Sequence, residues 1–161
     1  MNFAPLARLP KSAISILKEF SRHVLRRPVV GVLAIARDSD GRYLLIRRSD
    51  TGTWCFPGGT IDWGETVREA LVREVREETG ARVCEVGKLV GVYGRADRDP
   101  RFHAVSIAVE VTVDVGKMIA SNPIEIREVG LFEYGDIPHP LAMGTEDVLR
   151  DAVEGNMPRI E

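Results

Sequence analysis

The most constraining feature of this sequence is a helical pattern over residues 66–79, in which the inward-facing stripe changes from apolar to acidic. A helix turns by about 100° per residue, so positions three and four apart share a face. Four apolar side chains share one face: Val67, Ala70, Leu71 and Val75. Glu74 and Glu78 lie about 40° apart on that face, with Glu77 about 60° to the other side of Glu74. We therefore expect carboxylates beside the side chains that dock this helix on a sheet.

Three neighbouring carboxylates on a partly buried surface need a compensating charge, because each uncompensated ion resists removal from water. Oxygen ligands without His or Cys favour Mg²⁺, Mn²⁺ or Ca²⁺ over Zn²⁺. The simpler alternative is a solvated helix with ordinary ion pairs such as Arg73–Glu77. The upstream segment Pro57-Gly58-Gly59 favours the metal, because glycine lets a backbone group approach a metal-bound phosphate closely.

The same segment resembles the signature box of the Nudix hydrolases. Gly59 is followed after five residues by Glu65, and after seven more by the run Arg73-Glu74-Val75-Arg76-Glu77-Glu78-Thr79-Gly80-Ala81. Every charged and glycine position of the box is present, while Ala81 replaces a larger aliphatic residue. So many fixed positions make the match specific, unlike a lone glycine-rich loop. With similar flanking segments, the likeness covers roughly residues 29–155.

The rest of the chain is a mixture of strands with one helix inserted and another at the end, which favours α+β layers around one sheet. Strand-like runs cover residues 29–36, 43–46, 54–56, 83–93, 104–113 and 129–134. A turn signal at residues 38–41 predicts a hairpin between the first two runs, and residues 57–59 are expected to form a glycine turn. The last helix is expected to have Thr145 as its N-cap and to stop at Gly155. The family resemblance implies a Nudix-like α/β/α sandwich with a mixed central sheet.

The resemblance also implies a Mg²⁺-dependent reaction, with Mn²⁺ as an alternative metal. In this family, water attacks a phosphorus of a diphosphate linkage and splits it into two phosphorylated products. The implied metal ligands are Glu74, Glu77, Glu78 and the backbone carbonyl of Gly59.

Catalytic roles are implied for Glu74 and for Glu77, the latter as a further ligand or as a proton acceptor. Arg73 is expected to hold a neighbouring glutamate in position, and Glu65 lies near the metals in the family pattern. Members often take one more acid from a distant loop. Glu125 is the candidate here, with Glu128 as the alternative.

Four residues are candidates for contact with the substrate. Arg47 and Arg48 alternate along a strand, so only one of them points toward the site, and the family pattern favours Arg48. Trp54 either stacks on a base or fills the core, and its size favours the core. Arg101 lies in the segment of residues 97–106, which resembles one found in ADP-ribose-hydrolysing members.

The substrate is therefore expected to be a nucleoside-diphosphate derivative, with ADP-ribose or a related nucleotide sugar favoured. A proline that marks many ADP-ribose enzymes about sixteen residues past the box is absent, because Ala96 lies nearest and Pro100 beyond. One alternative is a nucleoside triphosphate pyrophosphohydrolase that removes damaged nucleotides. The alternative of another class is a non-catalytic Nudix domain that senses a nucleotide, although such modules tend to lose box acids.

Residues 1–28 are expected to form an extension with a basic amphipathic helix, and residues 29–161 the Nudix domain. The extension is expected to pack on its own domain or to take part in a homodimer, and membrane-surface contact is a weaker alternative. The net charge of −2 argues against nucleic acid as a partner, and no apolar run is long enough to span a membrane. With no recognisable signal peptide, a cytoplasmic location is expected by default. Cys55 and Cys84 lack a metal or redox spacing, so both are expected to be buried thiols.

Overall fold

The computed structural model describes residues 27–99, 101–116, 118, 123–155 and 158–161. The predicted N-terminal helix lies outside these residues, and so does the surface proposed for a homodimer. Both stay predictions.

In the described part of the chain, one sheet of eight strands is combined with two α-helices and a short 3-10 helix, η2. The strands are β1 (Val29–Arg37), β2 (Tyr43–Arg48), β3 (Trp54–Cys55), β4 (Gly58–Thr60), β5 (Arg82–Tyr93), β6 (Ala104–Asp114), β7 (Ile126–Phe132) and β8 (Arg159–Ile160). The helices are α2 (Val67–Thr79), η2 (Tyr134–Asp136) and α3 (Thr145–Glu154). Each long strand overlaps a run expected from the sequence.

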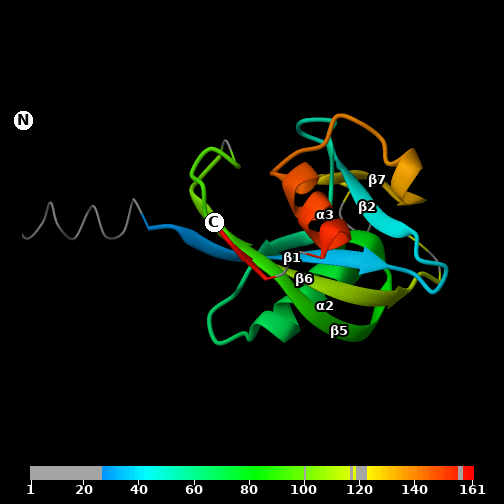
Figure 1. Cartoon of the computed structure of the whole chain (residues 1–161), viewed down its shortest axis with the longest axis horizontal. Helices are drawn as coiled ribbons and strands as arrows, with labels where there is room; N and C mark the ends of the chain where they lie inside the picture. Colours follow the sequence, from blue (N-terminus) through cyan, green and yellow to red (C-terminus); the bar gives the residue numbers. More distant parts are fainter. Residues whose placement is uncertain (1–26, 100, 117, 119–122, 156–157) are drawn as a thin grey trace, which may run out of the picture.

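The sheet is mixed, as the family resemblance implied. Its main path runs β3-β2-β1-β6-β5-β8, with β4 paired to β1 and β7 paired to β2 (Figure 1). The pairs β1–β6 and β5–β8 are parallel, and the other pairs are antiparallel.

The expected hairpin between the first two strands is present but short. They pair antiparallel only where Arg37 meets Tyr43, because β4 and β6 occupy the edges of β1. One detail of the expected sheet was wrong. The expected glycine turn is instead the strand β4, in which Gly58 and Gly59 pair with Leu33 and Val32.

Alternation along β1 builds a core on each face of the sheet. Leu33 and Ile35 join the cluster that contains Val148 and Leu149 of α3. The residues of β1 that point to the opposite face join the cluster that contains the apolar side chains of α2. These β1 residues are Val32, Ala34 and Ala36. Figure 1 shows the two helices on opposite sides of the sheet. The described residues therefore form an α/β/α sandwich.

Local signals at both ends fix α2 where the sequence predicted it. Thr66 is the N-cap, and its hydroxyl oxygen accepts from the backbone N–H of Glu69 while the Glu69 carboxylate accepts from the N–H of Thr66. This reciprocal pair is a capping box. Gly80 ends the helix at φ 72°, a left-handed conformation that glycine adopts without strain.

Two further expectations were wrong in detail. Helix α3 ends at Gly155 as predicted, but its N-cap is Gly144, and Thr145 is its first residue. The Thr145 hydroxyl donates instead to the carbonyl of Ala142. Cys55 is buried, whereas Cys84 is exposed, because it is an extra residue between paired positions 83 and 85 of β5.

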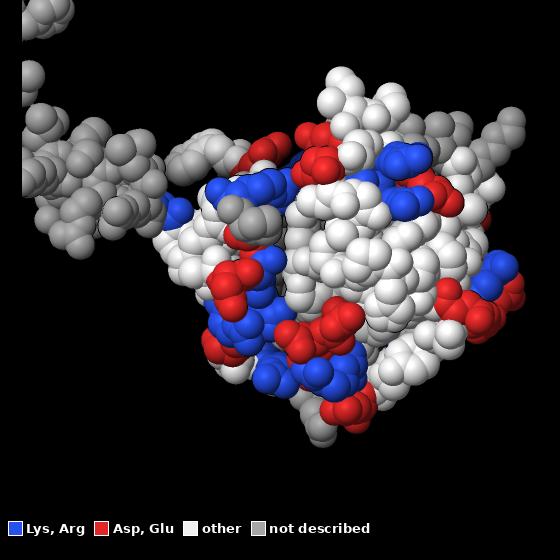
Figure 2. Space-filling model, turned by 90° about the horizontal axis from the view of Figure 1, so that it is seen from above, with Lys and Arg blue, Asp and Glu red and all other residues white. Residues whose placement is uncertain are grey.

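No helix among the described residues is long and apolar enough to cross a membrane. On the face shown in Figure 2, basic and acidic side chains lie next to one another, without a continuous basic patch.

Replacing Thr66 with alanine should lower the free energy of unfolding by about 1 kcal/mol, because the N-cap hydroxyl is lost. Chemical denaturation at equilibrium measures this change. Thr66→Ser is the matched control, since it keeps the hydroxyl and should retain most of the stability. Equal destabilisation by both substitutions would contradict the capping role.

Candidate active site

The acidic half of α2 packs against the glycine strand β4. Glu78 is only 7% exposed, and its Oε2 accepts a hydrogen bond of 2.8 Å from the backbone N–H of Gly58. Burial raises the pKa of the Glu78 carboxyl to about 8, and repulsion from Glu74 and Glu125 adds to this shift. The Gly58 N–H and the positive charge of Arg48 oppose it. Ionised Glu78 is therefore short of positive partners.

Glu74 lies beside Glu78 in a similar environment. Its side chain is 13% exposed, and burial raises the pKa of its carboxyl, although Arg73 opposes the shift. The Nη1 of Arg73 donates to its Oε1 over 2.8 Å. Gly59 packs directly against this carboxylate, because a Cβ at residue 59 would collide with the carboxylate oxygens of Glu74.

Arg73 joins α2 to the first part of the box, which precedes the helix. Its Nε and Nη2 each donate to the Glu65 carboxylate over 2.8 Å, and Nη2 also donates to the carbonyl of Thr60 over 2.9 Å. Glu77 stands at the rim, with its side chain 51% exposed and its Oε2 3.5 Å from Arg73 Nη1. The geometry thus gives Arg73 a positioning role, while Glu77 is open to water.

The chemistry of these donors fits a hard divalent cation. The carboxylates of Glu74 and Glu78 and the backbone of Gly59 supply oxygen ligands, which Mg²⁺ and Mn²⁺ prefer. Within the described ranges, no three Asp, Glu, His or Cys side chains already surround a common metal position. Glu74 is held by Arg73 and Glu78 by Gly58, so each carboxylate has one protein partner of its own. The metal assignment to Gly59, Glu74, Glu77 and Glu78 stays a prediction.

The two arginines of β2 separate as the strand alternation predicted. Arg48 is 8% exposed, donates to Asp50 over 2.9 and 2.8 Å, and its charge lowers the pKa of Glu78. Arg47 donates instead to the carbonyl of Gly52 and lies 3.5 Å from Glu128. Arg48 is therefore the arginine whose charge reaches the acidic site.

The alternatives for the distant acid separate in the same way. Glu125 precedes β7, is exposed, and raises the pKa of Glu78 by repulsion. Glu128 is paired with Arg47. Of the two, only Glu125 acts on the buried glutamate.

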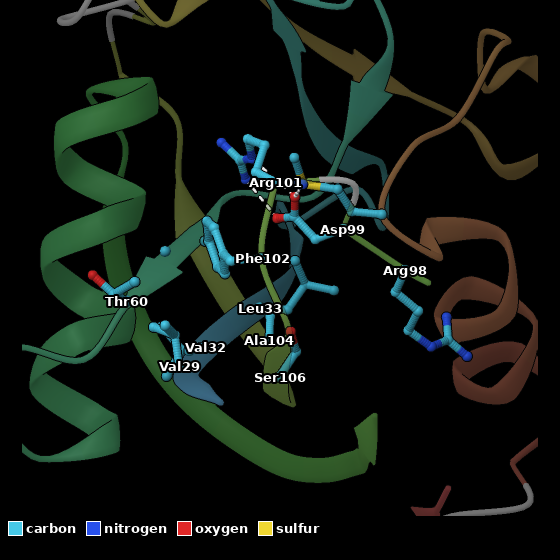
Figure 3. Close-up of a pocket in the computed structure, with 14 residues that line it drawn as sticks. Val29, Val32, Leu33, Thr60, Arg98, Asp99, Arg101, Phe102, Ala104 and Ser106 are labelled. Carbon is cyan, nitrogen blue, oxygen red and sulfur yellow. Dashed lines mark hydrogen bonds and ion pairs between the residues drawn. The ribbon is translucent and has the colours of Figure 1, made fainter. Parts of the chain in front are cut away.

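A pocket lies next to the box glycines. It is lined by Val29, Gly31, Val32, Leu33, Gly58, Gly59, Thr60, Arg98, Asp99, Arg101, Phe102, Ala104, Ser106 and Met143. Figure 3 shows Arg101 and Asp99 side by side at one side of it. Arg101 donates to Asp99 over 2.9 and 2.7 Å, and its guanidinium lies 5.1 Å from the ring centroid of Phe102. Arg101, a candidate for contact with the substrate, thus lies in a pocket that adjoins the acidic site.

Trp54 occupies the core, as its size favoured. It is 6% exposed and meets Phe132 edge-on, with ring centroids 5.0 Å apart. A ring this buried fills the core and is not open for a base to stack on, which favours the core alternative for Trp54.

Comparisons with known proteins agree with this geometry. A family model described as NUDIX domain matches residues 26–152. An ADP-ribose pyrophosphatase of Methanocaldococcus jannaschii is 39% identical over 127 residues, which are 77% of this chain and 72% of that protein. This chain belongs to the Nudix hydrolase family.

Solved structures support the same fold. A MutT NUDIX hydrolase from Burkholderia pseudomallei has a TM-score of 0.69 and 32% identity, covering 78% of this chain and 98% of its own. The NUDIX domain of Shewanella oneidensis NrtR, solved with ADP ribose, has a TM-score of 0.72 at 20% identity, covering 92% of this chain and all of its own. At that identity the second likeness concerns the fold alone. Nudix hydrolases generally use divalent metals.

Sequence reasoning on this Nudix chain missed the aspartates that hold the arginines. Asp50 and Asp99 each grip an arginine two residues away with both carboxylate oxygens. The spacing Asp99 to Arg101 was visible in the sequence, but only the loop conformation shows that the side chains meet. Gly58 was missed as the donor to Glu78 for the same reason.

Gly59→Ala should weaken Mn²⁺ binding by at least roughly tenfold, because its Cβ would displace the Glu74 carboxylate. Isothermal titration of Mn²⁺ into the folded variants measures this change. Gly135→Ala is the matched control, since a Cβ there has no heavy atom within 4 Å. Unchanged Mn²⁺ affinity in a folded Gly59→Ala protein would contradict the assignment of Glu74 as a metal ligand.

Proposed function

We propose that this Nudix hydrolase cleaves the diphosphate linkage of ADP-ribose or a related nucleotide sugar, with Mg²⁺ as its metal. The observation that carries the proposal is the pocket beside Gly58 and Gly59, which pairs an exposed aromatic ring with an arginine next to the acidic site. The Methanocaldococcus relative, an ADP-ribose pyrophosphatase, supports the same substrate class.

The floor of the pocket is built from small residues on two parallel strands. Gly31 of β1 pairs with Ser106 of β6, and Val29 pairs with Ala104. Short side chains at these positions leave a hollow above the sheet, while the 38% exposed ring of Phe102 forms one wall. A flat apolar group such as a nucleobase suits this surface, since stacking on an aromatic face is favourable.

Arg48 and Arg101 present guanidinium groups between the pocket and the acids. Arg101 is 42% exposed, and Arg48 is close enough that each arginine lowers the pKa of the aspartate that holds the other. A guanidinium presents donors in a planar fork that matches phosphate oxygens. Both arginines are already oriented by their aspartates, so little side-chain freedom is lost when phosphate binds.

On the acidic side, Glu74 and Glu78 would hold the cation, together with the Gly59 carbonyl and Glu77. A bound Mg²⁺ would offset the charge of the diphosphate and lower the pKa of a coordinated water. Arg73 keeps Glu74 aimed at β4 and ties it to Glu65. Glu77 and Glu125 are exposed and are suited to accept a proton from the attacking water.

Hydrolysis of a damaged nucleoside triphosphate at the same metal site is the second candidate. It is favoured by a Bacillus subtilis relative named putative 8-oxo-dGTP diphosphatase, 42% identical over 65 residues. A nucleotide-sensing domain without turnover is the third. It is disfavoured because every box acid is present. A cytoplasmic location also remains a prediction.

Incubation with ADP-ribose and Mg²⁺ should yield AMP and ribose 5-phosphate in equal amounts, whereas cleavage of a triphosphate would release pyrophosphate. Chromatography of a substrate panel with Mg²⁺ and with Mn²⁺ distinguishes the two reactions. Turnover of triphosphates alone would overturn the proposed substrate. Binding of nucleotides without any turnover would favour a sensor.

Glu78→Gln should lower kcat by at least roughly 10²-fold, because metal positioning supplies much of the transition-state stabilisation. The amide keeps an acceptor for the Gly58 N–H, so the fold should persist, as circular dichroism can verify. Glu154→Gln, the same substitution at an exposed position of α3, is the control and should leave kcat unchanged. A folded Glu78→Gln enzyme with full activity would show that this carboxylate is not required.

A further inference from the structure

The loop of residues 94–103, which joins β5 to β6, forms a wall of the pocket. Arg98, Asp99, Arg101 and Phe102 of this loop line it. Among its described residues, the loop makes one internal backbone hydrogen bond, from the Arg98 N–H to the Arg95 carbonyl over 3.3 Å. Its conformation therefore depends on side-chain hydrogen bonds within the loop, such as those of Asp99 and His103, and on side-chain contacts with other segments.

The strongest of these contacts is the carboxylate of Glu161, which follows β8. It accepts from the backbone N–H groups of Gly94 and Arg95 over 3.2 Å each, and from Arg98 Nε and Nη2 over 2.8 and 2.5 Å. The Arg98 guanidinium lowers the pKa of this carboxyl to about 2, and the side chain is 13% exposed. In Figure 1 the C-terminal end lies beside the loop.

Arg98 extends the contact from Glu161 to helix α3. Its Nη2 donates to Asp147 over 3.0 Å, and its guanidinium lies 5.0 Å from the ring centroid of Tyr93. The Tyr93 hydroxyl in turn donates to the buried carboxylate of Asp151 over 2.9 Å. The loop is thus tied to β8 and α3 through one 9% exposed arginine side chain.

Two arginines of this loop, Arg98 and Arg101, have different roles. Figure 3 shows Arg98 turned toward α3, whereas Arg101 faces Asp99 at the pocket. Arg98 faces two carboxylates, those of Asp147 and Glu161, so its charge is already compensated. Arg101 keeps 42% of its side chain exposed and is the one available to substrate.

We propose that Glu161 is a positioning residue that acts through Arg98 to set the pocket wall presenting Asp99 and Arg101 to the substrate. Its carboxylate accepts four hydrogen bonds, from the backbone N–H groups of Gly94 and Arg95 and from Nε and Nη2 of Arg98. No other described group accepts from all four of these donors. Without it, the N–H groups of Gly94 and Arg95 lose this acceptor, and Arg98 keeps its contacts with Gly144, Asp147 and the ring of Tyr93. The effect on substrate rests on the proposed function, whereas the effect on loop order does not.

Glu161→Gln should raise KM for ADP-ribose by roughly tenfold, the scale of one lost charge-assisted hydrogen bond. The kcat and the Mn²⁺ affinity should stay within about twofold of the wild type, because the box residues are untouched. Asp97→Asn is the matched control, since Asp97 lies in the same loop but forms an exposed ion pair with Arg95. An unchanged KM, or a parallel fall in Mn²⁺ affinity, would overturn the proposal.

A double-mutant cycle tests whether Glu161 acts through Arg98. The Glu161→Gln, Arg98→Gln double variant should have a KM close to that of the worse single variant, whereas independent effects would add and contradict the coupling. Hydrogen exchange of the backbone amides of residues 94–99 and 101–103 gives a readout without substrate, and Glu161→Gln should accelerate it relative to Asp97→Asn. If the wild type fails to cleave ADP-ribose, the proposed function falls. Unaltered exchange would by itself refute the positioning role.

Discussion

The packing of two helical carboxylates against a strand made of glycines is the constraint on which the rest of the structure depends. A Cβ at residue 58 would collide with the carbonyl of Val32, and one at residue 59 with the carboxylate of Glu74. Only glycine therefore lets β4 lie between β1 and α2. Because β4 takes an edge of β1, β2 is left to pair with β3 and β7, and its contact with β1 shrinks to Arg37 and Tyr43. The site and the sheet topology have the same cause.

Around this centre, the described arginines are oriented by carboxylates before any ligand is present. Arg73 is gripped by Glu65, Arg48 by Asp50 and Arg101 by Asp99. These pairs leave little net charge, so orientation rather than a strong positive field is what they provide. Guanidinium groups held in fixed directions lose little freedom on binding, which favours affinity and correct placement of a phosphate. Burial of Arg48 also limits screening of its charge by salt.

The sequence predicted the parts of this arrangement that follow from periodicity or from short-range signals. The acidic stripe, the end of α2 at Gly80 and the separation of Arg47 from Arg48 all follow from helix or strand geometry. The strand β4 and the exposed Cys84 were not predictable, because each depends on a partner strand and its register. The contact of Glu161 with Gly94 spans 67 residues, so no local pattern encodes it. Long-range side-chain contacts thus mark the limit of the sequence argument.

The two halves of helix α2 have different roles: the first half stabilises the fold, and the second half carries the acidic site. Its first turns supply the capping box and the fully buried side chains of Ala70 and Leu71, which dock it on the sheet. Its later turns place Glu78 where the folded state disfavours ionisation, since the pKa of about 8 lies above that of an ordinary glutamate. Without a bound cation, the free energy of unfolding therefore falls as pH rises from about 4.5, the ordinary glutamate pKa, to about 8. The docked first half offsets this cost, and a cation bound at the second half would reverse it, because positive charge favours the ionised carboxylates.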